Sequence, residues 1–178
     1  MSIYFEKVNR FANINLPLPE RKTSKSAGYD FVVAEDIIVP SYLKMMEQLK
    51  TFTAANEPLA LDEIGQITKT SKLKPTLVST GMKCHMEDNQ YLEISVRSSC
   101  PLKNWLIMAN GSGKIDSDYY GNPDNDGEIF FQIINLSPFD IILHQGDRIG
   151  QGIIYNYLVT DDDKAEGIRQ GGFGSTGH

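Results

Sequence analysis

The sequence EIFFQIINLSPFDIILHQGDRIGQGIIYNYLV, which runs from Glu128 to Val159, alternates short apolar runs with turn residues. The runs are rich in Ile, Phe and Tyr, which favour strands, and they span Glu128 to Asn135, Ile141 to Leu143 and Ile149 to Val159. Turn residues separate them at Ser137-Pro138 and at Gln145-Gly146-Asp147. We therefore predict three consecutive strands in this part of the chain.

The same pattern extends toward the N-terminus. Further strands are predicted at Thr76 to Met86, Tyr91 to Val96 and Trp105 to Ala109, and Tyr29 to Val39 has the pattern of a strand or short hairpin ended by Pro40. Many short strands at near-regular spacing are typical of a sandwich or barrel of the jelly-roll type. We therefore expect a mostly β protein.

One segment, residues 41–75, interrupts the strand pattern. From Ser41 to about Ala55, apolar residues recur every three positions, at Leu43, Met46, Leu49 and Phe52. This spacing predicts one amphipathic helix. The polar stretch from Asn56 to Pro75 is predicted to be a loop.

Length and composition limit the class of protein. The 178 residues fit one domain, residues 1–178. No signal peptide is visible, and no apolar run reaches the ~20 residues that a membrane-spanning helix needs. Cys84 and Cys100 are not spaced like a metal site and are expected to stay reduced. A cytoplasmic protein that binds no membrane is therefore expected.

The charge balance narrows the choice of partner. Lys and Arg number 17 against 23 Asp and Glu, a formal net charge of −6. General nucleic-acid binding normally requires a basic surface, so we expect no nucleic-acid partner. An anionic small molecule remains compatible, because local arginines can hold phosphates on an acidic protein.

The segment VRSSCPLK, Val96 to Lys103, follows a predicted strand and places an arginine beside two hydroxyls. Arg97, Ser98 and Ser99 could offer a guanidinium fork and two O–H donors to one phosphate. A turn with an exposed arginine is the alternative.

The segment GSGKIDSDYYG, Gly111 to Gly121, carries two carboxylates between glycines. In an extended strand Asp116 and Asp118 share one face, opposite Ile115, Ser117 and Tyr119. The pair could orient a water, bind a cation or simply be solvated. Gly111 and Gly113 would let a ligand approach the backbone closely.

The C-terminal stretch GGFGSTG, Gly171 to Gly177, has too many glycines to form regular structure alone. With Arg169, Ser175 and Thr176 it could wrap a phosphate, and a disordered tail is the alternative. The isolated Phe173 favours the first reading, because an aromatic ring in such a tail needs a surface such as a nucleobase to stack on.

Taken together, five segments resemble the five motifs of the trimeric dUTP diphosphatases, the dUTPase family. They are SAGYD (26–30), VRSSCPLK (96–103), GKIDSDYYG (113–121), GDRIGQGI (146–153) and RQGGFGSTG (169–177). The resemblance implies a jelly-roll-like distorted β-barrel with a flexible glycine-rich C-terminal arm, residues 167–178. It also implies a homotrimer whose active sites are shared between subunits. The reaction would convert dUTP and water to dUMP and pyrophosphate, with Mg²⁺ held by the triphosphate.

The resemblance also implies roles for single residues. Asp116 would activate the attacking water, and Tyr119 would pack under the deoxyribose. Uracil would be read by the hairpin that contains Asn110, Gly113, Lys114 and Ile115, and covered by Phe173 and Gly174 of the arm. Phosphate contacts would come from Arg97, Ser98, Ser99, Gln151, Arg169, Ser175 and Thr176. Mg²⁺ would have no direct protein ligand, with Asp30 near it through a water.

The chain departs from the family pattern in three places. Arg169 lies four residues before Phe173, where the family usually has five. Extra residues, NPDND, precede Gly127, and we expect their acidic side chains to point away from the phosphates. The insertion at residues 41–75 is longer than usual, and its helix should bury its apolar face on the barrel or on a protein partner. Two alternatives therefore remain: a dCTP deaminase-like enzyme, and a dUTP-sensing regulator that acts through this insertion.

Overall fold

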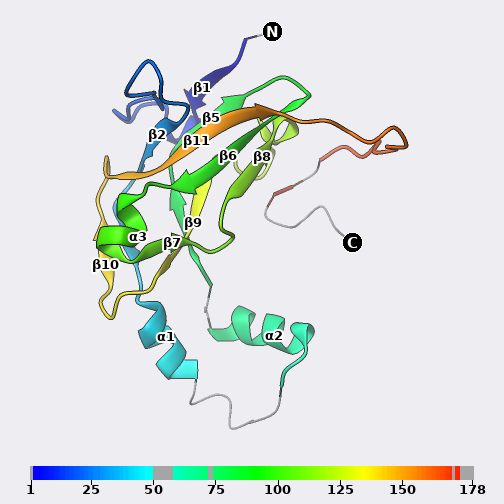
Figure 1. The fold of residues 1–178 in the computed structure, drawn as a ribbon. Helices are drawn as coiled ribbons and strands as arrows, with labels where there is room; N and C mark the ends of the chain where they lie inside the picture. The colour runs from blue at the N-terminus through cyan, green and yellow to red at the C-terminus, as the bar shows by residue number, and fades with distance from the viewer. Residues whose placement is uncertain (1, 50–57, 72–73, 170, 173–178) are drawn as a thin grey trace.

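The structure is a computed structural model that describes residues 2–49, 58–71, 74–169 and 171–172 (Figure 1). The strands are β1 (Tyr4–Lys7), β2 (Tyr29–Val32), β3 (Ile37–Val39), β4 (Thr76–Ser79), β5 (Met82–His85), β6 (Gln90–Val96), β7 (Leu106–Met108), β8 (Gly113–Asp116), β9 (Phe130–Asn135), β10 (Ile141–Leu143) and β11 (Arg148–Asn156). The helices are α1 (Tyr42–Leu49), α2 (Leu61–Ser71) and α3 (Ser99–Asn104), with 3₁₀ turns at Asn9–Phe11 and Ser117–Tyr119. The protein is mostly β, as predicted.

Two antiparallel sheets form the body of the molecule, with strand orders β2-β11-β6-β8 and β4-β9-β7. Their inner faces meet through buried aromatic rings, where Phe31 of β2 lies 5.9 Å from Phe131 of β9, centroid to centroid. Smaller pairs, β1-β5 and β10-β3, complete the strand set. Alternation along β9 buries Phe131, Ile133 and Asn135 and leaves Phe130 and Gln132 on the other face. That second face contributes to the candidate site.

Two of the predicted strands are divided. The stretch Thr76 to Met86 forms β4 and β5, because Gly81 turns the chain between them with φ of +67°. The stretch Tyr29 to Val39 forms β2 and β3, which pair with β11 and β10 and not with each other. The hairpin option for this segment is therefore wrong.

The helices differ most from the prediction. α1 starts where expected, and residues 50–57, including Phe52, lie outside the described part of the chain. The predicted loop over Asn56 to Pro75 is wrong, because it contains α2. The start of α2 carries a local signal that the polar composition obscures: Glu63 accepts a hydrogen bond from the backbone N–H of Ala60 at 2.7 Å, which satisfies an end group of the helix.

Of the two options for the apolar face of α1, burial on the barrel is not observed for Leu43 and Met46, and burial on a protein partner stays a prediction. Leu43 is 50% exposed and Met46 is 37% exposed, and Figure 1 shows α1 and α2 beyond one end of the strands. α3 was not predicted either. It begins at Ser99 and ends at Asn104, and the following residue, Trp105, caps it in a left-handed conformation with φ of +56°. Pro101 is compatible with this helix because it lies in the first turn, where its missing N–H costs nothing.

Within the described residues, none of the helices has the length and apolar character needed to cross a bilayer. Both cysteines are free and buried. Burial raises the pKa of the Cys84 thiol to about 12, so this thiol is protonated and unreactive in the folded protein.

Candidate active site

The connection between β7 and β8 forms one wall of the site. The hairpin expected here is wrong, because β7 pairs with β9 in one sheet and β8 pairs with β6 in the other. Ala109 donates its N–H to the carbonyl of Gln132 at 2.8 Å, which fixes the start of this connection to β9. The turn then passes through Gly111, with φ of +72°. Gly113 lies opposite Ile94 of β6, and a Cβ on it would come within 2.8 Å of Ile94 Cγ1. A glycine is needed here so that β8 can pair with β6.

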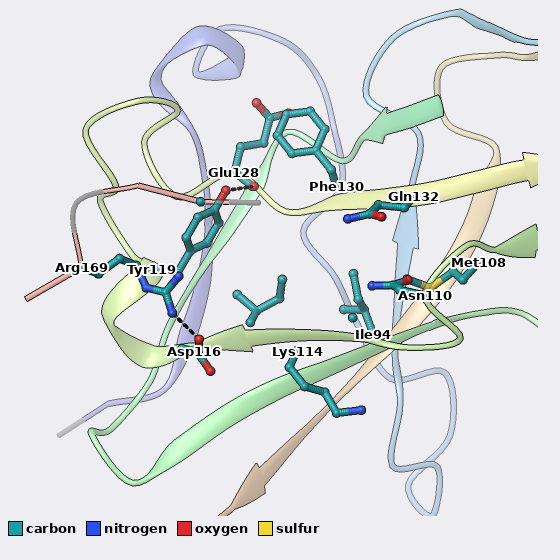
Figure 2. Close-up of a pocket in the computed structure, with 13 residues that line it drawn as sticks. Ile94, Met108, Asn110, Lys114, Asp116, Tyr119, Glu128, Phe130, Gln132 and Arg169 are labelled. Atoms are coloured by element: carbon teal, nitrogen blue, oxygen red, sulfur yellow. Dashed lines mark hydrogen bonds and ion pairs between the residues drawn. The ribbon is translucent and has the colours of Figure 1, made fainter. Parts of the chain in front are cut away.

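The β7–β8 connection lines a cavity of about 230 Å³ (Figure 2). Seven of the residues that line it were predicted as site residues: Asn110, Gly113, Lys114, Ile115, Asp116, Tyr119 and Arg169. The ammonium of Lys114 is held beside the cavity by Glu93, at 2.6 Å. The cavity therefore brings together, in one chain, the GKIDSDYYG segment (113–121) and the start of the C-terminal arm.

Asp116 and Asp118 both bind Arg169. The guanidinium donates to Asp116 Oδ2 and, at 2.7 Å, to Asp118 Oδ1. Burial acts to lower the pKa of Arg169, but the two carboxylates outweigh it and raise the pKa. The carboxylates stay open to solvent, with side chains 54% and 55% exposed. A group that enters the cavity from solvent can therefore reach Asp116.

Tyr119 is the buried aromatic wall of the cavity, with 6% of its surface exposed. Burial raises the pKa of its phenol above the ordinary value. The expectation of one extended strand through this segment is wrong, because β8 ends at Asp116 and Ser117–Tyr119 is a 3₁₀ turn. The turn swings Tyr119 toward the cavity, so Asp116 and Tyr119 line the same space (Figure 2).

The extra residues and the following glycine form a tight turn, Asn122 to Gly127, which we call the inserted turn. Asp126 points to the N-terminal part of the chain, where it binds Lys83 Nζ at 2.9 Å and the N–H of Asn9 at 2.8 Å. The carboxylate of Asp126 thus faces away from the cavity, as expected.

The VRSSCPLK segment (96–103) lies away from the cavity. Arg97 Nε lies 3.7 Å from Asp30 Oδ1, and Arg148 lies 3.7 Å from Asp30 Oδ2. Gln151 is opposite Asp30 in the β2–β11 register. None of the residues Arg97, Ser98, Ser99, Gln151 and Asp30 lines the cavity formed within the described part of this chain. Strand direction explains the separation: Arg97 follows the end of β6, beyond Ile94 at the cavity, whereas Asp116 pairs with Tyr91 near the start of that strand.

The remaining predicted contacts, Phe173, Gly174, Ser175 and Thr176, lie outside the described residues. Arg169 does reach the cavity, even though its spacing from Phe173 departs from the family pattern, and Ile168 before it is 88% exposed.

Six cavity residues were missed in the sequence: Ile94, Met108, Glu128, Phe130, Gln132 and Gly172. Phe130 and Gln132 carry a usable signal, since they alternate with the buried residues of β9 and must face the opposite way. Glu128 does not, because a glutamate after a glycine usually indicates a solvated turn. Here its carboxylate is buried and binds Arg10 at 2.8 and 3.0 Å.

Comparisons with known proteins agree with this geometry. The profile of the dUTPase family matches residues 66–177. The deoxyuridine 5'-triphosphate nucleotidohydrolase of Lactococcus lactis subsp. lactis (strain IL1403) is 34% identical over 176 residues, 97% of this chain and 96% of that protein. The enzyme of the same name from Rickettsia typhi (strain ATCC VR-144 / Wilmington) is 30% identical and covers 99% of both chains.

Solved structures give the same result. The crystal structure of the dUTPase from Streptococcus mutans matches with a TM-score of 0.68 at 31% identity, over 89% of this chain and 98% of that one. Family profile, full-length relatives and fold coincide on the segments that build the cavity, and the chain belongs to the dUTPase family.

Proposed function

We propose that this protein, a single domain over residues 1–178, hydrolyses dUTP to dUMP and pyrophosphate. The observation that carries the proposal is the cavity itself, which places the Asp116 carboxylate beside the Tyr119 wall and the β7–β8 connection. The relatives that match almost the whole chain are named as nucleotidohydrolases of deoxyuridine 5'-triphosphate. Hydrolysis of dUTP would keep uracil out of DNA and supply dUMP for thymidylate synthesis.

In this proposal Asp116 is the general base. Its carboxylate is the kind of group that can accept a proton from a positioned water. The water oxygen attacks the α-phosphorus in line, its proton passes to Asp116, and the bond to the bridging oxygen breaks to release pyrophosphate. Arg169, now bound to Asp116 and Asp118, would exchange these carboxylates for phosphate oxygens when the triphosphate binds.

Selection of the nucleotide would come from the cavity walls. The backbone of the β7–β8 connection, from Asn110 to Ile115, would present polar groups to the uracil edge, and cytosine would leave them unpaired. The ring of Tyr119 would lie against the deoxyribose, where a 2′-hydroxyl has no room. Fixed, buried walls support this role, since Tyr119 and Met108 are 6% and 5% exposed.

The residues present fit a magnesium ion carried by the substrate. Mg²⁺ prefers phosphate oxygens, waters and one or two carboxylates. Within the described residues no three His, Cys, Asp or Glu side chains gather into a protein-built metal site. Asp30 would hold a water ligand of the ion. When bound, Mg²⁺ would neutralise part of the triphosphate charge.

The residues outside the cavity favour a shared site. Arg97, Ser98, Ser99 and Gln151 offer phosphate donors but lie away from Asp116 within one chain. We infer that they serve the cavity of a neighbouring subunit in a homotrimer of jelly-roll-like barrels, which completes each site with a second chain. The substrate is an intracellular nucleotide, and we place the protein in the cytoplasm.

Pyrophosphate release from dUTP, dCTP, dTTP and UTP, each with Mg²⁺ and with chelator, tests the proposal. Release from dUTP that is lost with chelator is the expected result. Ammonia from dCTP would instead indicate the deaminase-like alternative. Binding of dUTP without any turnover would favour the regulator that acts through residues 41–75.

A further inference from the structure

One side chain of the inserted turn, Asn125, contacts a residue that lines the cavity. Asn125 Nδ2 donates a hydrogen bond to the hydroxyl of Tyr119 at 2.6 Å. The same hydroxyl donates to the backbone carbonyl of Glu128 at 3.3 Å. The phenol oxygen is therefore used both as acceptor and as donor, and both partners are on the segment that contains the inserted turn.

The turn is built to hold Asn125 in place. Its Oδ1 accepts the N–H of Gly127 at 3.1 Å, and the N–H of Asp126 binds the carbonyl of Asn122 at 2.7 Å. Gly127 has φ of +77°, and a Cβ on it would lie 2.6 Å from the Tyr119 carbonyl oxygen. The turn thus packs directly against the backbone that carries Tyr119.

Other parts of the chain hold the ring itself. A Cβ on Gly172 would lie 2.8 Å from Tyr119 Cε2, so the C-terminal segment is in close contact with the ring. Arg169 lies with its guanidinium carbon 5.9 Å from the ring centroid. Gly172 thus lies against the edge of the ring and the Arg169 guanidinium lies over the ring, while the hydroxyl end is fixed by Asn125 and Glu128.

We propose that Asn125 is a positioning residue for sugar selection: it fixes the Tyr119 ring at the depth that leaves no room for a 2′-hydroxyl. This inference rests on the proposed function, in which Tyr119 faces the deoxyribose. A wall can reject one extra oxygen atom only if it cannot retreat, and the hydrogen bond from Asn125 removes that freedom. The inserted turn is thereby a specificity element, and it acts through Asn125 and not through Asp126, whose carboxylate faces away from the cavity.

The test is Asn125→Ala, with steady-state kinetics on dUTP and UTP. One lost hydrogen bond of about 1 kcal/mol corresponds to a factor of about five. We expect the kcat/KM ratio of dUTP over UTP to fall about fivefold and KM for dUTP to rise, with kcat changed by less than about twofold. An unchanged ratio would overturn the proposal.

Asp126→Asn is the matched control. Asp126 is in the same turn, and the substitution removes the negative charge that pairs with Lys83 of β5 without removing a hydrogen bond to Tyr119. Asparagine also tolerates the φ of +61° at this position. We expect it to lower the melting temperature and leave the dUTP/UTP ratio unchanged. If it changes the ratio as much as Asn125→Ala does, general loosening of the turn is the cause and the proposal fails.

Tyr119→Phe provides the second variant, because it deletes the same hydrogen bond from the other side. In this background Asn125→Ala should have no further effect on the ratio, and additive effects would contradict the coupling. Calorimetric binding of dUMP and UMP separates this inference from the proposed function. If the wild type does not hydrolyse dUTP, the proposed function fails, and the dUMP/UMP binding ratio of the same variants still decides the role of Asn125.

Discussion

The contact between Arg169 and Asp116 has the most direct consequence for catalysis among the single-residue interactions. In the free protein the proposed base is paired with a guanidinium, and Asp118 shares that partner at 2.7 Å. A triphosphate that enters the cavity offers the guanidinium a phosphate group whose oxygens share up to two negative charges and can accept two parallel hydrogen bonds. Binding of the triphosphate would then free the Asp116 carboxylate from Arg169, so that Asp116 can act as a base only when the substrate is bound.

Asp116→Asn tests the base at this scale. The amide cannot accept the proton of the attacking water, so turnover should fall by a factor of about 10² to 10⁴. Binding of dUTP, measured by calorimetry, should change little, because the side chain keeps its shape. Asp118→Asn is the matched control, since it also removes a partner of Arg169. Equal losses in both variants would remove the special role of Asp116.

At the scale of elements, close contact between the two sheets depends on glycines in β11. A Cβ on Gly150 would lie 2.0 Å from Phe131 Cε1 and 2.7 Å from the carbonyl oxygen of Ser95. Phe131 is fully buried, so it has no direction in which to move. Gly150, which lies within the fourth motif, is thus required for packing of the two sheets.

Gly150→Ala should therefore lower the free energy of unfolding by about 1–3 kcal/mol, the usual cost of overpacking a core. Chemical denaturation with the midpoint and slope fitted together gives the measurement. Gly167→Ala is the control, because nothing lies within 4 Å of a Cβ at that position. A Gly150→Ala variant as stable as the control would show that the sheets can separate without cost.

The elements also show what a sequence can and cannot predict. Alternation and turn residues were sufficient for β6, β7, β9, β10 and β11, because those signals are local. α2 was missed because its apolar residues are diluted by polar ones, and α3 because its serines indicated a turn. The cavity contribution of Glu128 depends on which segments become neighbours, and no local pattern carries that information. The place of Arg97 outside the cavity has the same cause.

At the scale of the whole molecule, one charged cluster ties the N-terminal strand to the site. Lys83 of β5 lies 3.3 Å from Glu6 of β1 and 2.9 Å from Asp126 of the inserted turn. Tyr120 donates a hydrogen bond to Glu6, and this bond, with a smaller contribution from Lys83, lowers the pKa of Glu6 below its ordinary value of 4.5. The first strand is thus connected electrostatically to the segment that carries Tyr119.

The direction of this shift predicts acid sensitivity. A carboxyl group with a lowered folded-state pKa stabilises the protein above its unfolded value, and the contribution is lost as the pH falls through the folded value. The melting temperature should therefore fall as the pH is lowered below about 4.5, the ordinary value for this group. Glu6→Gln should make that fall shallower, whereas Glu166→Gln, at an exposed position, should not. If the melting temperatures of Glu6→Gln and wild type fall in parallel as the pH is lowered, the charged cluster is excluded as a cause of the acid sensitivity.

The insertion leaves and rejoins the body of the molecule at one strand. Ser41 bridges Asn135 of β9, and Thr76 pairs with Ile133 of the same strand. β7 occupies the other side of β9, so both ends lie along one side, about 7 Å apart at two residues of strand. We expect replacement of residues 42–74 by a short Gly-Ser linker to preserve the melting temperature within a few degrees and to leave dUTP hydrolysis intact. Loss of folding would show that α1 or α2 stabilises the sheets.

This arrangement gives the chain a place where its length can change over evolutionary time at little cost. Each doubling of a loop's length costs only about 0.6 kcal/mol of closure entropy. The pairing of Ser41 and Thr76 with β9 fixes the two ends of the insertion, so the residues between these ends need not affect the register of β9. New segments inserted there would be inherited without any adjustment of the catalytic cavity. Variation among descendants of this gene should therefore accumulate at residues 42–74 as gains and losses of whole segments, while the strands beside them keep their lengths.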